Sequence, residues 1–270
     1  MTEISPTHPR YASLRVRARL AEALRRGLVV PEGLIAQGRG EAFDYFLGER
    51  TTASARRAES AAAVWLLAAR HPVVSVNGNV AALAADAIAR LARARPGLRV
   101  EVNLFHRTSQ RAARIARVLR QAGVARVLGV RPTAVLPGLA SDRALVDANG
   151  IASADVCLVP LEDGDRADAL ARRGTKVISI DLNPLSRTNR TADLPIVDEL
   201  TRALEGIRRA IARAPAFAPG VFPPFAAGAA LDDAIAAMDA NLRRSGRPAR
   251  RRRASRPPPR GSGRPMRRTR

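Results

Sequence analysis

Short runs rich in valine, isoleucine and leucine alternate with longer amphipathic stretches from residue 72 onward. Strands that alternate with helices are typical of βαβ units, whose crossover connections place the strands in one parallel sheet. The pattern therefore predicts an α/β fold with a parallel sheet flanked by helices. We expect strands at residues 73–76, 98–104, 126–130, 156–160, 176–181 and 194–197, and helices near 80–94, 108–122, 164–173 and 199–213.

The segment before residue 72 has the pattern of helices rather than strands. Leucines recur among arginines over residues 10–28 at an amphipathic spacing, and residues 54–70 have the composition of a buried helix around Trp65. Residues 31–45 begin with a proline and contain three glycines. Because glycine and proline are the strongest breakers of regular structure, we interpret this stretch as a positioned loop.

The composition changes twice after the predicted sheet. Residues 214–226 are rich in Pro, Ala and Phe and cannot form one regular element, whereas 228–243 has the pattern of a last amphipathic helix. The following Arg/Pro/Ser/Gly stretch predicts disorder. We therefore divide the chain into an N-terminal helical segment (1–71), an α/β core (72–213), a linker and helix (214–243) and a disordered Arg/Pro-rich tail (244–270).

The hydrophobic residues are almost all aliphatic. Of the 270 residues, 46% are hydrophobic but only 3% are aromatic, so the core must be built from Ala, Val, Leu and Ile, as suits helices packed on a parallel sheet. The longest apolar run, 61–69, is far shorter than the roughly 20 residues of a membrane-spanning helix, and no signal-peptide pattern opens the chain. We expect a cytoplasmic protein without membrane contact.

Much of the net charge of +22 lies at one end of the chain. Residues 243–270 contain thirteen arginines and no acidic residue, which leaves +9 for the rest. Such a tail favours nonspecific, salt-dependent contact with nucleic acid. A basic nucleic-acid-binding protein is therefore an alternative to an enzyme, although the tail can make such contacts without the folded body.

The cysteine and histidine residues do not indicate a metal site or a covalent nucleophile. The single cysteine, Cys157, excludes an internal disulfide and lies in a hydrophobic run, where a buried structural role is expected. His8, His71 and His106 lack the paired spacing of a zinc site. No Ser-His-Asp order can be assigned either, so we expect neither a structural metal nor a covalent nucleophile.

The first predicted strand ends in a polar turn that can bind phosphate. Ser75, Asn77, Gly78 and Asn79 stand between this strand and the start of a helix. Gly78 permits close approach of the backbone, Asn79 can cap the helix, and free amides at a helix N-terminus attract an anion. An ordinary capped turn is an equal alternative, since neither the dinucleotide G-x-G-x-x-G nor the Walker pattern is present. That absence also counts against a nucleotide-linked oxidoreductase.

Two arginines and three carboxylates are further candidates. Arg39 stands between two glycines, so its guanidinium could fork onto a phosphate or carboxylate, and Arg17 on the first helix could reach the same ligand. Glu162, Asp163 and Asp165 follow a predicted strand, and their oxygen ligands suit Mg²⁺ bound to ATP phosphates. The alternative to a ligand site is structural: the arginines would be solvated surface charges, and the acids would complement the dipole of a helix.

Polar residues follow two later strands as well. Asp181 could accept a hydrogen bond from a ribose hydroxyl, Arg187 could meet a phosphate, and Asp198 and Glu199 end the last strand. The carboxyl ends of parallel strands meet at one edge of a sheet. The sequence therefore predicts one shared ligand crevice at this edge.

Several long strings together resemble the archaeal 4-phosphopantoate–β-alanine ligase family, also called phosphopantothenate synthetase. They are His8-Pro9-Arg10-Tyr11 and residues 33–45, 75–79, 160–166 and 180–187, and the likeness extends over roughly residues 5–212. The resemblance implies a homodimer with a Rossmann-like core and ATP contacts at Arg17, Arg39, Asp181, Leu182, Asn183, Arg187, Thr188, Glu199 and Leu200. Glu199 departs from the Asn that family members often have.

The resemblance also implies a reaction. ATP would couple 4-phosphopantoate to β-alanine through an acyl adenylate, giving 4′-phosphopantothenate, AMP and pyrophosphate for coenzyme A synthesis. We expect Arg17 and Arg39 to be catalytic by neutralising phosphate charge together with Mg²⁺. The turn formed by Ser75, Asn77, Gly78 and Asn79 is then expected to hold a phosphate of 4-phosphopantoate or of ATP.

Overall fold

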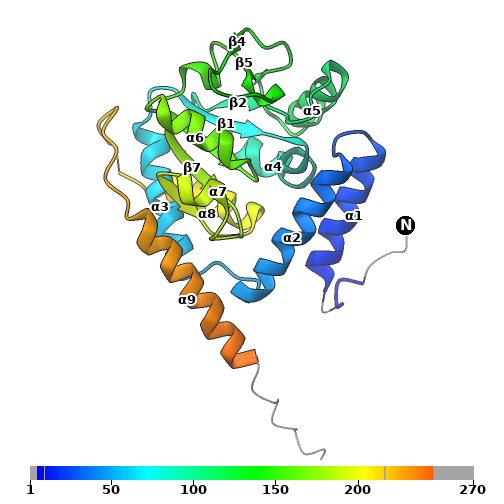
Figure 1. The fold of residues 1–270 in the computed structure, drawn as a ribbon, viewed down its shortest axis with the longest axis vertical. Helices are drawn as coiled ribbons and strands as arrows, with labels where there is room; N and C mark the ends of the chain where they lie inside the picture. The colour runs from blue at the N-terminus through cyan, green and yellow to red at the C-terminus, as the bar shows by residue number, and fades with distance from the viewer. Residues whose placement is uncertain (1–4, 9, 216, 246–270) are drawn as a thin grey trace, which may run out of the picture.

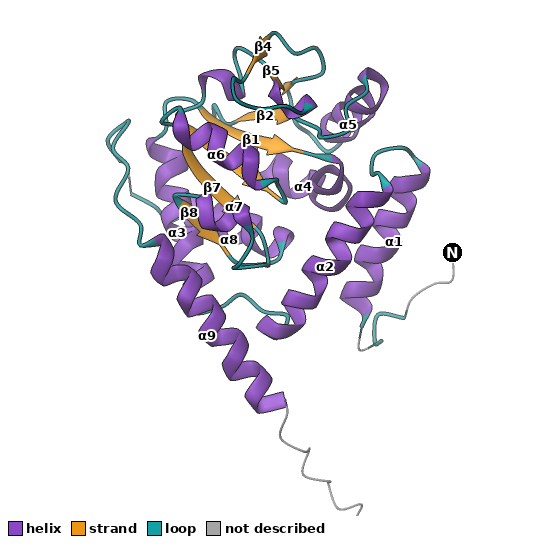
Figure 2. Ribbon diagram, in the orientation of Figure 1, coloured by secondary structure: helices purple, strands orange, loops and turns teal. Residues whose placement is uncertain are grey.

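The computed structural model describes residues 5–8, 10–215 and 217–245. At its centre is a six-stranded parallel sheet in the order β3-β2-β1-β6-β7-β8 (Figures 1 and 2). The strands are β1 (Pro72–Val76), β2 (Arg99–Val102), β3 (Val127–Leu128), β6 (Val156–Pro160), β7 (Lys176–Ile180) and β8 (Leu194–Ile196). The predicted parallel α/β sheet is confirmed. An unpredicted antiparallel pair, β4 (Ala134–Val135) and β5 (Leu145–Val146), lies beside it.

The strand order creates one switch in direction. From β1 the chain adds β2 and then β3 on one side, and it later returns to place β6 against β1 and builds outward through β7 and β8. The connections that leave β1 and β6 therefore diverge, and the carboxyl ends of these two strands border a crevice. This is the position at which open parallel sheets bind ligands.

Alternating side chains pack two cores against the sheet. Val74 and Val76 belong to the larger core, while their neighbour Val73 belongs to a second one on the opposite face, as the period of two in a strand requires. The larger core also includes side chains from α1 (Tyr11–Arg25), α3 (Ala53–Ala68), α4 (Gly78–Ala94), α5 (Ser109–Gln121) and α8 (Leu200–Ile211). The second core is covered by α6 (Gly164–Arg172) and the β4–β5 pair.

The interpretation of residues 31–45 as a loop is wrong. They lie within the helix α2 (Pro31–Leu47), which has proline at its start and Gly48 in the left-handed conformation (φ 79°) at its end, as is usual for helix termini. Leu47 is 1% exposed and packs with Phe43 in a small core against α9 (Ala227–Ser245). Tertiary packing therefore outweighs the helix-weakening effect of the glycines.

The remaining regions agree with the expected helices at both ends. The helices α1 and α2 pack together, and α9 extends away from the sheet (Figure 1). The division into segments 1–71, 72–213, 214–243 and 244–270 stays a prediction, and residues 246–270 of the predicted disordered tail lie outside the described part. None of the described helices is both long and apolar enough to cross a bilayer.

Candidate active site

A cavity of about 380 Å³ lies at the carboxyl ends of β1, β6 and β7, beneath α2. It is located at the switch between β1 and β6, so the predicted shared crevice exists. Its lining includes many of the predicted site residues: Arg39, Asn77, Gly78, Asn79, Glu162, Asp163, Asp181, Leu182, Asn183, Glu199 and Leu200.

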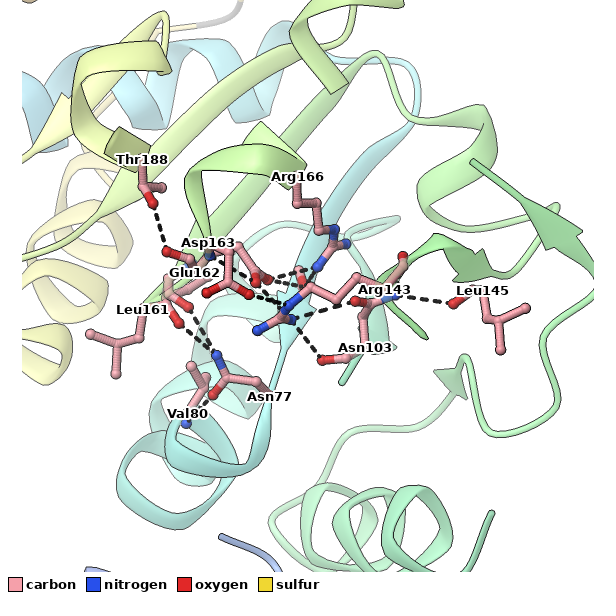
Figure 3. A network of polar contacts seen from close by, with 12 residues as sticks. Asn77, Val80, Asn103, Arg143, Leu145, Leu161, Glu162, Asp163, Arg166 and Thr188 are labelled. Atoms are coloured by element: carbon pink, nitrogen blue, oxygen red, sulfur yellow. Dashed lines mark hydrogen bonds and ion pairs between the residues drawn. The ribbon is translucent and has the colours of Figure 1, made fainter. Parts of the chain in front are cut away.

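The turn predicted to bind phosphate has a different capping residue from the one expected. The Asn77 side chain, not that of Asn79, accepts a hydrogen bond from the Val80 amide (3.1 Å), and it donates another to the Leu161 carbonyl (2.8 Å) (Figure 3). Asn79 donates to the Gly33 carbonyl (2.8 Å) and so ties α2 to α4. Because Asn77 is the N-cap, the next amides, of Gly78 and Asn79, have no helical acceptor. They remain available to an anion.

Gly78 is required by the packing of the protein itself. A Cβ atom at this position would lie 2.2 Å from the Leu28 carbonyl oxygen and 2.7 Å from Nη2 of Arg111. The loop between α1 and α2 therefore presses directly on the first turn of α4. Close backbone approach was predicted here, but the structure shows that the approaching group is a protein carbonyl.

Glu162, which lines the cavity, also belongs to a buried ionic cluster (Figure 3). Its carboxylate is 2.6 Å from Nη1 of Arg143 and 2.7 Å from Nη1 of Arg166, which is fully buried. Ser75 is 1% exposed and accepts a hydrogen bond from Arg166 (2.8 Å). Ser75 thus supports this cluster and does not line the cavity, in contrast to its predicted role in binding substrate.

The three predicted magnesium ligands do not surround one point. Glu162 binds the two arginines, Asp163 pairs with Arg143 (2.7 Å), and Asp165 pairs with Arg187 (2.5 Å) with its side chain 68% exposed. Across the described residues, no group of three or more His, Cys, Asp or Glu side chains is arranged to hold a metal ion. These carboxylates do not fit a protein-held Mg²⁺, because guanidinium groups already neutralise them.

The β7 and β8 side of the cavity contains most of the predicted ATP contacts. Burial raises the pKa of Asp181, while the amide of Asn183, which donates to its carboxylate (2.9 Å), and the charge of Arg39 oppose this rise. Glu199 accepts hydrogen bonds from the Thr201 and Arg202 amides and so caps α8. The Glu199 side chain is therefore occupied within the protein.

Three predicted ATP-binding residues lie outside the cavity lining. Arg17 makes a bidentate pair with Glu41 (3.0 and 2.9 Å) and is 51% exposed. Arg187 is 74% exposed at the start of α7 (Arg187–Thr191), and the neighbouring Thr188 is buried and donates to the Glu162 carbonyl (2.6 Å). The structure brings Arg39 to the cavity but leaves Arg17 on another surface of the same chain.

The sequence matches known proteins over about three quarters of its length. A model of the phosphopantothenate/pantothenate synthetase family matches residues 54–238. The chain belongs to this family. Three relatives of the chain are each named 4-phosphopantoate–β-alanine ligase. The protein from Methanosarcina mazei is 56% identical, with 76% of this chain and 80% of the relative covered.

Two further relatives have similar sequence identity and coverage. The ligase from Methanospirillum hungatei is 57% identical, with 76% of this chain and 84% of the relative covered. The ligase from Thermococcus kodakarensis is 52% identical, with 75% and 78% covered. The family likeness predicted from the strings of residues is thereby confirmed.

Two arginines in the cavity of this synthetase were missed from the sequence. Arg111 on α5 and Arg143 in the short 3-10 helix Asp142–Ala144 both line it, together with Phe105 and His106. Lysine and arginine account for 46 residues of the chain, so no local pattern distinguishes these two. The only available signal was the position of Arg111 in the first turn of the helix that Thr108 caps.

Proposed function

We propose that this synthetase uses ATP to condense 4-phosphopantoate with β-alanine, forming 4′-phosphopantothenate, AMP and pyrophosphate in coenzyme A biosynthesis. Relatives that are 52–57% identical over three quarters of the chain have the name of this ligase. The single structural observation that carries the proposal is the cavity at the switch between β1 and β6. It combines free helix amides with arginines, as substrates that carry phosphate require.

The proposed chemistry has two steps. A carboxylate oxygen of 4-phosphopantoate attacks the α-phosphorus of ATP, and the bond from this phosphorus to pyrophosphate breaks. The amine of β-alanine then attacks the acyl carbon of the adenylate, the bond from this carbon to the AMP oxygen breaks, and the amine loses a proton to solvent. Each step needs its reactants aligned and its developing phosphate charge neutralised.

The protein supplies position and charge rather than a covalent nucleophile. Burial raises the pKa of the only cysteine, Cys157, to about 12, so its thiol stays protonated and unreactive. We assign ATP to the side of the cavity that contains Arg39, Asp181 and Asn183. Arg39 is proposed to neutralise the charge of the ATP phosphates. Mg²⁺ is proposed as a companion of ATP held by the phosphates, since Glu162, Asp163 and Asp165 are paired with arginines.

Arg17 is assigned a place in catalysis only as part of a homodimer, because its own chain leaves it away from the cavity lining. Exposed apolar side chains, among them Ile35 (73%) and Leu185 (62%), are consistent with a partner surface. Light scattering on the purified protein should give twice the chain mass, and the mass of a single chain would refute the dimer. The same proposal places the enzyme in the cytoplasm, where ATP is available.

The activity is tested by incubating the purified chain with ATP, Mg²⁺, 4-phosphopantoate and β-alanine. AMP should form only when all are present, and AMP formation independent of β-alanine would refute the ligase. Arg39→Ala should lower kcat about 100-fold while the melting temperature stays unchanged, because no described side chain forms an ion pair with Arg39. Full retained turnover would reject its role.

Nucleic-acid binding through the basic tail remains the second candidate, since thirteen arginines lie in residues 243–270. A chain that ends at Ser245 should lose salt-dependent nucleic-acid binding and keep ligase activity. Tight binding by the shortened chain at physiological salt would contradict this separation of tail and body.

A further inference from the structure

Two arginines from distant parts of the chain meet in the cavity with part of each guanidinium unused. Arg111 donates from Nε to the Leu28 carbonyl (2.9 Å) and from Nη1 to the His106 carbonyl (2.6 Å). Arg143 donates from Nε to Asp163 (2.7 Å), and its Nη1 pairs with Glu162. In both arginines Nη2 has no hydrogen-bond acceptor among the described residues. Each side chain is thus held in place while one donor group remains free.

Both arginines face the cavity that the first turn of α4 also lines. Nη2 of Arg111 is 2.7 Å from the place where a Cβ atom of Gly78 would be. Arg143 is 6% exposed, lines the same cavity, and lies close enough for its charge to act on Arg111. The free amides of Gly78 and Asn79 belong to the same turn. Two guanidinium groups and a helix N-terminus therefore converge on one end of the cavity.

The electrostatics of this end favour an anion. Burial lowers the pKa of Arg111, the charge of Arg143 lowers it further, and only the exposed Glu32 opposes them. The nearby carboxylates of Glu162 and Asp163 are already paired with arginines. An anion with two negative charges between the two Nη2 groups would relieve their repulsion and accept several charge-assisted hydrogen bonds.

We propose that Arg111 and Arg143, with the amides of Gly78 and Asn79, bind the phosphate monoester of 4-phosphopantoate. This inference rests on the proposed function. The other end of the cavity, at β7 and β8, is assigned to ATP, so the two substrates approach from opposite ends and the carboxylate of 4-phosphopantoate is directed toward the α-phosphorus. The arginine pair then selects the phosphorylated acid over pantoate.

The test is a comparison of Michaelis constants in Arg111→Gln, Arg111→Lys and the unchanged protein. Arg111→Gln should raise KM for 4-phosphopantoate about 100-fold, because a buried charge-assisted pair is lost. KM for ATP and for β-alanine should stay within about threefold. Arg111→Lys keeps the charge but loses the planar fork, so it should restore part of the affinity. Should Arg111→Gln fold poorly, Arg111→Lys makes the same comparison with a smaller shift.

The control is Arg117→Gln, an exposed arginine on the same helix that does not line the cavity. It should leave all three constants unchanged. An increase in KM for ATP instead of 4-phosphopantoate would assign the pair to an ATP phosphate and overturn the inference. Unchanged constants, or an equal loss for all three substrates, would overturn it as well. Absence of β-alanine-dependent AMP formation in the unchanged protein would instead refute the proposed function.

Discussion

Buried acidic side chains occur in two ionic clusters that differ in the ratio of arginines to carboxylates. The cavity cluster consists of Glu162, Asp163, Arg143 and Arg166, and the helix cluster of Glu59, Asp198, Asp44 and Arg202 between α3, α2 and α8. In the cavity cluster, two arginines face one buried and one half-exposed carboxylate. In the helix cluster, Arg202 is paired with Asp44 and Asp198, and Glu59 forms no ion pair among the described residues.

The buried glutamate of each cluster therefore has a different set of partners. Glu162 is paired with two guanidinium groups, whereas Oε1 of Glu59 has no hydrogen-bond partner in the described part of the chain. Burial, and after it the charge of Asp198, raises the pKa of Glu59 to about 8. The carboxylates of the cavity cluster are therefore fully paired with arginines, while the helix cluster retains a proton on Glu59 near neutral pH.

The largest expected effect is in the cavity cluster. Glu162→Gln leaves Arg143 and Arg166 buried without their shared carboxylate, and two nitrogens of Arg166 already lack a partner among the described residues. We expect a loss of about 3–5 kcal/mol in the free energy of unfolding, measured by urea denaturation. Asp165→Asn, which removes an exposed pair with Arg187, should cost less than about 1 kcal/mol. Equal effects would contradict the difference between buried and exposed pairs.

A smaller effect is expected from crowding the helix cluster. A Cβ atom at Gly206 would lie 2.0 Å from Oε2 of Glu59, so Gly206→Ala should lower the free energy of unfolding by about 1–3 kcal/mol. Gly38 is also inside a helix but has no atom within 4 Å of such a Cβ. Gly38→Ala should therefore stabilise the protein by about 0.5–1 kcal/mol. A change of the same sign in the free energy of unfolding for both substitutions would contradict the crowding of Glu59 at Gly206.

The smallest effect, at pH 4, is expected from removing the titrating group itself. At this pH Glu59 is mostly protonated in both the folded and the unfolded chain, and Glu59→Gln replaces it by a neutral amide of similar shape, so the free energy of unfolding should change by less than about 1 kcal/mol. Because the folded pKa of about 8 lies above the ordinary value of 4.5, the stabilising contribution of Glu59 is complete below pH 4.5 and is lost as the pH rises through 8. The unchanged protein should lose more stability between pH 6 and 9 than Glu59→Gln, and parallel pH profiles would contradict the raised pKa.

The sequence was sufficient for the parallel sheet and its shared edge. The alternation of β-branched runs with helices reflects local propensity and burial. The polar residues that follow β1, β6 and β7 do line the cavity, as predicted. Local rules failed where tertiary packing decides. The glycines of α2 suggested a loop, but Leu47 and Phe43 bury that helix against α9.

Side-chain roles were harder to predict than positions. Asn77 and Asn79 are two residues apart, and only the actual start of α4 makes Asn77 the cap. Glu162 has the right chemistry for magnesium, but the fold places two arginines on it. Arg111 and Arg143 become neighbours only when α5 and the segment before β5 close around the same cavity, which no spacing along the chain reveals.

The cavity is expected to bring the carboxylate of 4-phosphopantoate directly to the α-phosphorus of ATP. Synthesis from 4-phosphopantoate labelled with ¹⁸O in both carboxylate oxygens, followed by mass spectrometry of the AMP, tests this most directly. The account predicts one ¹⁸O atom in each AMP, because that oxygen leaves the acyl carbon with the adenylate. Unlabelled AMP, with 4′-phosphopantothenate still formed, would contradict it.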